Sequence, residues 1–254
     1  MDWDNEEFVA KQVEIWGLNL KYASDLLKDN ETLVALAVKQ SGYSLKYVSD
    51  RLKDNEEIVT LALKRYPCAL KYASNRLKDD EEIVTLAAEG EGCALEYASD
   101  RLKDNEVIVA WAVKQDGGAL KYASDRLKNN VNIVAFAVNQ NGCALEYASD
   151  QFKDKEEIVT LAVKQDGCAL KYASDRLKNN VNVTAFSVNR GGCALKHASV
   201  QFKDNEFIVA LAVKNNYWAL EFASVKLQNS RKMNLISKVE NKYSDHRHSM
   251  THLL

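Results

Sequence analysis

Five cysteines are the residues of this 254-residue sequence best suited to chemistry, because thiolates bind zinc, attack electrophiles and form disulfides. They are Cys68, Cys93, Cys143, Cys168 and Cys193, and the intervals between them are 25 or 50 residues. If the interval reflects stacked helices, these lie about 8–10 Å apart. A disulfide needs Cα atoms within about 7 Å, and zinc needs several sulfurs about 2.3 Å from one ion. We therefore predict reduced cysteines at a tolerant position, with no metal site and no cofactor.

A histidine cluster near the C-terminus is the second candidate for metal chemistry. His246, His248 and His252 lie close together, and the last two have the spacing of one helix face. No cysteine or second ligand cluster accompanies them, so incidental metal affinity is the alternative to a dedicated site, which we do not predict. The sequence has no phosphate loop, nucleophile elbow or recurrent carboxylate–histidine pair. We predict no enzyme activity, with hydrolysis at an unrecognised site as the alternative.

A row of tyrosines with basic neighbours is the strongest candidate for a binding surface. The tyrosines recur every 25 residues, and arginine follows four residues later in most copies. The predicted partner-binding residues are Tyr47, Tyr72, Tyr97, Tyr122, Tyr147, Tyr172, Arg51, Arg76, Arg101, Arg126 and Arg176. Aromatic and cationic groups in a row can bind an extended peptide or single-stranded nucleic acid. The alternative is a structural role, in which each ring fills the gap between neighbouring repeats and keeps its hydroxyl in water.

The 25-residue spacing belongs to a repeat that covers most of the chain. From Asp4 to Gln228 the sequence divides into consecutive units without insertion or deletion, starting at residues 4, 29, 54, 79, 104, 129, 154, 179 and 204. The unit at 54–78 reads DNEEIVTLALKRYPCALKYASNRLK, and the unit at 154–178 reads DKEEIVTLAVKQDGCALKYASDRLK. Every unit has Leu at position 17 and Ser at position 21. We predict that the serine hydroxyl bonds the carbonyl four residues earlier in a buried helix stripe.

Each unit is predicted to form two short helices joined by a turn. The Asp or Asn that opens each unit can cap the first helix, as with Asp54 and Glu57 at capping-box spacing. About ten residues follow that are apolar nearly all round, which predicts burial on several sides. Glycine at position 14 is predicted to end this helix in the left-handed conformation, and Pro67 at that position predicts a different turn. A second helix, typically ALKYASDRLK, closes the unit.

Helices this short are only marginally stable in isolation, so stacking between units must stabilise them. We predict an all-α fold, an α-solenoid of nine 25-residue helix-turn-helix repeats over residues 1–228. Residues 229–254 are predicted to form a degenerate capping helix and a polar tail, for which disorder is the alternative.

Composition narrows the classes of function. Lysine and arginine total 34 against 36 aspartates and glutamates, which argues against a basic nucleic-acid binder. The acidic start MDWDNEEF does not read as a signal peptide, and no apolar run is long enough to span a membrane. We predict a soluble, intracellular and cytoplasmic protein with no membrane contact. A protein or peptide is the expected partner, and single-stranded nucleic acid along the Tyr and Arg row is the alternative.

The sequence of the units, with the motifs AVKQDG, ALKYASDRLK and DNEEIV, resembles the repeat family named domain of unknown function 4116. The resemblance covers residues 4–228, and members of that family are built from units of roughly 50 residues, which would be two of the present units. It implies a repeat architecture and carries no catalytic residues. The predicted function is therefore a non-catalytic repeat scaffold that mediates protein–protein or peptide interaction.

Overall fold

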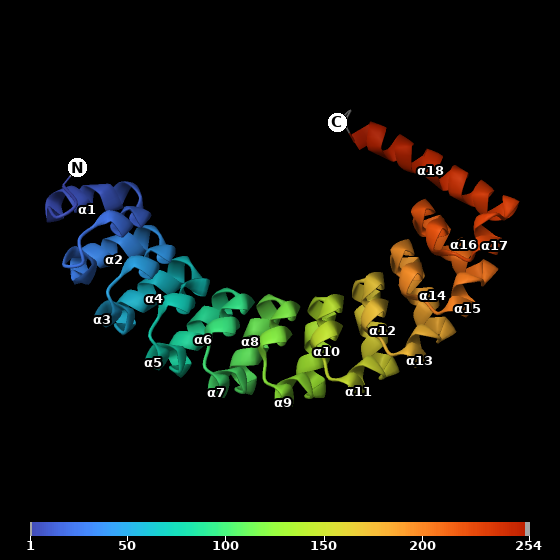
Figure 1. Cartoon of the computed structure of the whole chain (residues 1–254). Helices are drawn as coiled ribbons and strands as arrows, with labels where there is room; N and C mark the ends of the chain where they lie inside the picture. Colours follow the sequence, from blue (N-terminus) through green and yellow to red (C-terminus); the bar gives the residue numbers. More distant parts are fainter. Residues whose placement is uncertain (1, 252–254) are drawn as a thin grey trace. The chain divides into compact units, whose positions relative to one another are not determined.

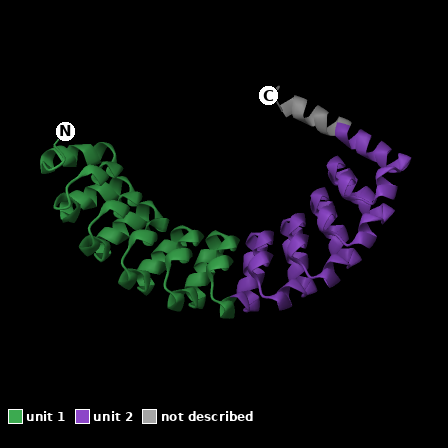
Figure 2. Cartoon of the chain, in the orientation of Figure 1, with its two compact units in different colours: residues 1–127 green, residues 128–254 purple. Residues whose placement is uncertain are grey.

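The computed structural model describes the backbone of residues 2–251 and the side chains of residues 2–241. The described residues form helices and no strand, so the prediction of an all-α solenoid is confirmed (Figure 1). The chain divides into two compact units, residues 1–127 and 128–254 (Figure 2).

Ten-residue α-helices begin the repeats. They are α1 Glu6–Ile15, α2 Glu31–Gln40, α4 Glu56–Arg65, α6 Glu81–Gly90, α8 Glu106–Gln115, α10 Val131–Gln140, α12 Glu156–Gln165, α14 Val181–Arg190 and α16 Glu206–Asn215. The N-cap is the second residue of the unit, as at Asn55, whose Oδ1 accepts from the N–H of Ile58 at 3.1 Å. The predicted cap at Asp54 is wrong by one residue, because Asp54 is the C-cap of the preceding short helix.

The second half of each repeat is two helices. The 3₁₀ helices are η1 Gly17–Tyr22, η3 Gly42–Tyr47, η4 Pro67–Tyr72, η5 Gly92–Tyr97, η6 Gly117–Tyr122, η7 Gly142–Tyr147, η8 Gly167–Tyr172, η9 Gly192–His197 and η10 Tyr217–Phe222. The short helices are η2 Leu27–Asp29, α3 Asp50–Lys53, α5 Asn75–Lys78, α7 Asp100–Lys103, α9 Asp125–Lys128, α11 Asp150–Lys153, α13 Asp175–Lys178, α15 Val200–Lys203 and α17 Val225–Gln228.

An extended alanine separates these two helices, so the single second helix predicted for ALKYASDRLK is wrong. Ala73 has φ −64° and ψ 161°, and Ser74 after it is the N-cap of α5. The Oγ of Ser74 accepts from the N–H of Leu77 at 3.2 Å. The predicted bond to a carbonyl four residues earlier is therefore replaced by a cap, the role in which serine is most favourable.

The glycines at unit position 14 serve close packing. No described residue has a positive φ, so the predicted left-handed helix end is wrong. A Cβ on Gly192 would lie 2.5 Å from the carbonyl oxygen of Ala212 in the next repeat, a distance that real Cβ atoms essentially never show. Since the glycines have ordinary φ, Pro67 fits the same turn, and η4 has the same six-residue length as its neighbours. The prediction of a different turn at Pro67 is also wrong.

The core lies between the layers of each compact unit. Within residues 1–127 the helices α1, α2, α4, α6 and α8 pack in order, and the 3₁₀ helices stack beside them. Helices α10, α12, α14 and α16 pack in the same way within residues 128–254. In α4, Ile58, Val59, Ala62 and Leu63 are buried, whereas Leu61 is only half-buried. One face of the ten-residue helices is therefore open, against the prediction of burial on nearly all sides.

The last element, α18 Arg231–Thr251, lies where the capping helix is predicted. It packs on α16, its Met233 is buried, and the Lys232 ammonium lies 2.8 Å from the Glu206 carboxylate. In the part of the chain that the structure describes, no helix is both long and apolar enough to cross a bilayer.

Candidate functional site

The predicted arginine row lies along the short helices, where each guanidinium bonds an aspartate. Arg76 Nε donates to Asp54 Oδ1 at 3.0 Å, and Nη2 donates to the Asp54 carbonyl at 2.7 Å. Its Nη1 donates to Glu56 at 2.8 Å. The matching pairs are Arg51 with Asp29, Arg101 with Asp79, Arg126 with Asp104 and Arg176 with Asp154. Much of the donor capacity of these guanidinium groups is thus used within the chain.

The serine at unit position 21 completes this link. Ser74 Oγ donates to Asp54 Oδ1, and the Ser74 N–H donates to the carbonyl of Lys53 at 3.0 Å. The hydrogen bond from Ser74 and, next among the stabilising contacts, that from Arg76 hold the pKa of Asp54 below its ordinary value. Because Asp54 ends α3 and Ser74 begins α5, the cluster joins consecutive short helices.

A paired substitution in the sequence indicates the bond between the aspartate and the arginine, which the sequence analysis of single residues did not predict. The unit that begins at residue 129 has Asn129 in place of the aspartate and Gln151 in place of the arginine. Ser149 Oγ donates to Asn129 Oδ1 at 2.7 Å, and Gln151 Nε2 donates to the same oxygen. In this unit a neutral pair therefore takes the place of the charged pair.

The predicted tyrosines are half-buried along the 3₁₀ helices. Tyr47, Tyr72, Tyr97 and Tyr122 belong to the first compact unit, and Tyr147 and Tyr172 belong to the second. Burial first, and then a hydrogen bond with Glu96, raises the pKa of Tyr122 to about 12. Lys121 Nζ lies 5.3 Å from the centroid of the same ring. The rings keep some exposed surface, and their role as partner-binding residues stays a prediction.

A second row, which the sequence reasoning assigned to the core, lies on the open face of the ten-residue helices. Large apolar side chains at unit position 8 are only half-buried or exposed: Leu36, Leu61, Leu86 and Trp111 in the first compact unit, and Phe136, Leu161, Phe186 and Leu211 in the second. Phe186 is 51% exposed. In α6 a shallow depression is lined by Leu86, Thr85, Glu81, Glu82 and Glu89. We call the eight apolar side chains at unit position 8, four in each compact unit, the position-8 row.

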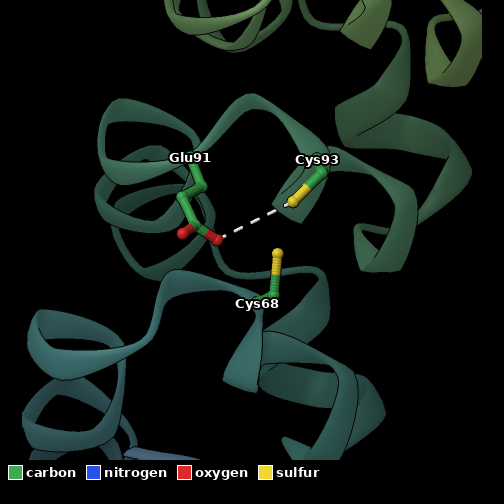
Figure 3. A group of neighbouring side chains, drawn as sticks. All are labelled: Cys68, Glu91 and Cys93. Atoms are coloured by element: carbon green, nitrogen blue, oxygen red, sulfur yellow. Dashed lines mark hydrogen bonds between the residues drawn. The ribbon is translucent and has the colours of Figure 1, made fainter. Parts of the chain in front are cut away.

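The five cysteines are free thiols, and cysteines of adjacent repeats come close to each other at Cys68 and Cys93 and again at Cys168 and Cys193. The Sγ atoms of Cys68 and Cys93 and one carboxylate oxygen of Glu91 all lie within 4.8 Å of one another (Figure 3). The prediction that cysteines 25 residues apart have distant sulfur atoms is therefore wrong for Cys68 and Cys93, because η4 and η5 pack directly against each other. The side chains of His246, His248 and His252 lie outside the described residues.

The repeat also matches a known family. The sequence profile of "Domain of unknown function (DUF4116)" matches five times in tandem, over residues 5–53, 55–109, 112–153, 155–184 and 185–228. The chain belongs to this family. The DUF4116 matches cover the repeated part of the chain, and they carry no activity to transfer. No curated protein and no solved structure matches the chain.

Proposed function

We propose that this DUF4116 protein is a non-catalytic scaffold that binds a protein or peptide segment along the part of the position-8 row that lies in the first compact unit. The observation that carries the proposal is the open face of the ten-residue helices, where a large apolar side chain recurs in consecutive repeats. Exposed apolar side chains arranged in a row are typical of interaction surfaces. Repeat proteins use such extended faces for binding, because each repeat adds one similar contact.

Acidic side chains beside the position-8 row favour a partner that carries positive charge. Glu57 and Glu82 are exposed in the first turns of α4 and α6, and the depression over Leu86 has three glutamates around it. Acidic side chains suit helix N-termini and also attract a basic partner over several ångströms. The partner segment therefore combines apolar side chains, which meet Leu61 and Leu86, with lysine or arginine residues.

The Tyr and Arg row supports binding less well. Arg101 Nε donates to the Asp79 carboxylate at 3.0 Å and its Nη2 donates to the Asp79 carbonyl at 2.5 Å. A phosphate group would have to compete with these bonds, so single-stranded nucleic acid is the weaker candidate. Binding of an oligonucleotide that falls steeply with salt and is weakened by Arg101→Ala would favour it instead.

Selection from a displayed peptide library tests the proposal. Peptides are selected on the wild-type chain and then measured on a Leu61→Ser/Leu86→Ser variant. An Asn75→Ser/Asp100→Ser variant serves as the control, since these residues are exposed on the short helices α5 and α7 and not on the ten-residue helices. We expect basic peptides with several apolar residues to bind the wild type and the control, and to lose at least about ten-fold in affinity on the Leu variant. Equal binding to all three proteins, or no enriched peptide family, contradicts the proposal.

A further inference from the structure

Two thiols and a carboxylate converge where two repeats of the first compact unit meet. Cys68 lies on η4, Cys93 lies on η5, and Glu91 connects α6 to η5 (Figure 3). Their ligand atoms lie within 4.8 Å of one another. Cys68 is buried, Cys93 is half-buried and Glu91 is exposed, so the group is held by the fold on one side and is open to solvent on the other.

The spacing of these atoms approaches that of a tetrahedral metal site. With zinc–sulfur distances of about 2.3 Å and zinc–oxygen distances of about 2.1 Å, two ligand atoms of one tetrahedron lie about 3.6–3.8 Å apart. Cys93 Sγ is 3.7 Å from Glu91 Oε2. The two separations that involve Cys68 Sγ are at most 4.8 Å, so side-chain rotations that shorten them by about 1 Å complete the tetrahedral spacing.

The backbone holds these side chains in place. The helices η4 and η5 pack against each other, and the N–H of Glu91 donates to the carbonyl of Ala87 at 3.0 Å. Burial, followed by hydrogen bonds with Cys93 and Glu91, raises the pKa of the Cys68 thiol.

The second compact unit contains a matched comparison. Cys143 and Cys168 occupy the equivalent places, with Asp166 in place of the glutamate. Asp166 Oδ1 accepts from the N–H of Cys168 at 2.9 Å, so this carboxylate caps the backbone of η8, and its Oδ2 accepts from the Cys143 thiol at 3.2 Å. Among the described residues, the three ligand atoms come within the 4.8 Å limit at Cys68, Glu91 and Cys93 only.

We propose that Cys68, Glu91 and Cys93 bind one divalent cation of the zinc class, with water at the fourth position. Two sulfurs favour a borderline or soft metal over magnesium or calcium, which prefer oxygen ligands. The bound ion joins η4 to η5 and thereby cross-links two neighbouring repeats. The proposal is independent of the position-8 row, because none of its ligands lies on the open face of the ten-residue helices.

Titration with Co²⁺ tests this site, because thiolate ligands give cobalt a charge-transfer absorption that histidine and carboxylate ligands do not give. The full chain is kept reduced, and the variants are Cys68→Ser, Cys93→Ser and Glu91→Gln. A Cys143→Ser/Cys168→Ser variant is the matched control. Thermal unfolding with and without Zn²⁺ provides a second readout, since an ion that binds the folded state raises the Tm.

We expect the absorption to saturate at one equivalent of Co²⁺ in the wild type and in the control, and Zn²⁺ to displace it. It should disappear in either single cysteine variant, and affinity should fall at least about ten-fold in Glu91→Gln. The proposal is overturned if the wild type gives no such absorption, or if the absorption survives in Cys68→Ser and Cys93→Ser. Loss of the absorption in the control variant overturns it equally.

Discussion

The Pro67 ring occupies the space that a side chain at Gly90 would need. A Cβ on Gly90 would lie 2.5 Å from Cγ of Pro67. Pro67 is the one proline of the chain, and Gly90 is the only glycine at the twelfth position of any of the nine units. The two exceptions to the repeat therefore compensate each other across the boundary between adjacent units.

This contact predicts that the effect of Gly90→Ala changes sign. Alanine normally stabilises a helix by about 1 kcal/mol relative to glycine, but here the rigid proline ring leaves no room, and overpacking costs about 1–3 kcal/mol. We expect Gly90→Ala to destabilise the wild type and to stabilise a Pro67→Gly chain. Chemical denaturation of the four proteins measures both effects, and additive effects would show that Pro67 and Gly90 are not coupled.

Gly42 is predicted to be required for packing in its own repeat, although Pro67 is accommodated at the same unit position in the next one. In Gly42→Ala the new Cβ would meet the carbonyl oxygen of Ala62, a backbone atom that cannot move aside, so we expect a loss of about 1–3 kcal/mol. Gly118→Ala is the control, since its nearest neighbour is the flexible Asp116 side chain at 3.2 Å. It should be neutral or slightly stabilising. Equal losses of unfolding free energy in the two variants would contradict the packing argument.

The Asp–Ser–Arg cluster predicts a specific acid sensitivity. The hydrogen bond from Ser99 first, and then that from Arg101, lower the pKa of Asp79 from its ordinary value of 3.8. The stabilisation is therefore present above that value and is lost as the pH falls through the lower pKa of the folded state. Asp79→Asn/Arg101→Gln reproduces the natural Asn129 and Gln151 pair, so its Tm should fall less than that of the wild type between about pH 7 and pH 3.

The matched control for this prediction is Asp79→Asn alone. It leaves Arg101 without a charged partner, so it should be less stable than the double variant at neutral pH. If the double variant and the wild type lose the same Tm on acidification, the aspartate is not responsible for the acid sensitivity.

Ser44 is predicted to be a weak point of the core. Its hydroxyl is fully buried and has no hydrogen-bond partner among the residues that the structure describes, whereas most other units have a buried alanine there. Removing an unsatisfied buried hydroxyl recovers about 1–3 kcal/mol of desolvation cost, so Ser44→Ala should raise the free energy of unfolding. In contrast, Ser74→Ala removes an N-cap and should cost about 0.5–2 kcal/mol. Urea unfolding distinguishes the two, and a destabilised Ser44→Ala would contradict the prediction.

The period of the sequence was enough to predict the all-α stack, because 25-residue units without insertion can only bury their apolar faces against one another. Local rules were not enough within a unit. Ala73 and Ser74 lie in a segment of good helix formers, yet the bonds from Ser74 to Lys53 and Asp54 break the helix there. Tertiary contact decided this break and also the need for glycine at position 14.

The contacts of the candidate binding residues could not be predicted from local sequence either. Their regular spacing predicts rows, but the row alone does not reveal that Arg76 is bonded to Asp54, which lies 22 residues earlier. The joint replacement by Asn129 and Gln151 is the sequence signal for that pair. The closeness of Cys68 and Cys93 depends on how tightly η4 and η5 approach, which no interval along the chain specifies.

The links between short helices also bear on how such a chain changes length in evolution. The side-chain bonds of Ser74 and Arg76 to Asp54 join residues 20 and 22 apart, so both partners are encoded inside one 25-residue unit. Duplication or loss of a whole unit by unequal recombination therefore carries complete pairs and leaves no orphaned charge at the junction. Pro67 and Gly90 are the exception, because they lie in adjacent units and are inherited together only when the boundary between those units is not the site of exchange.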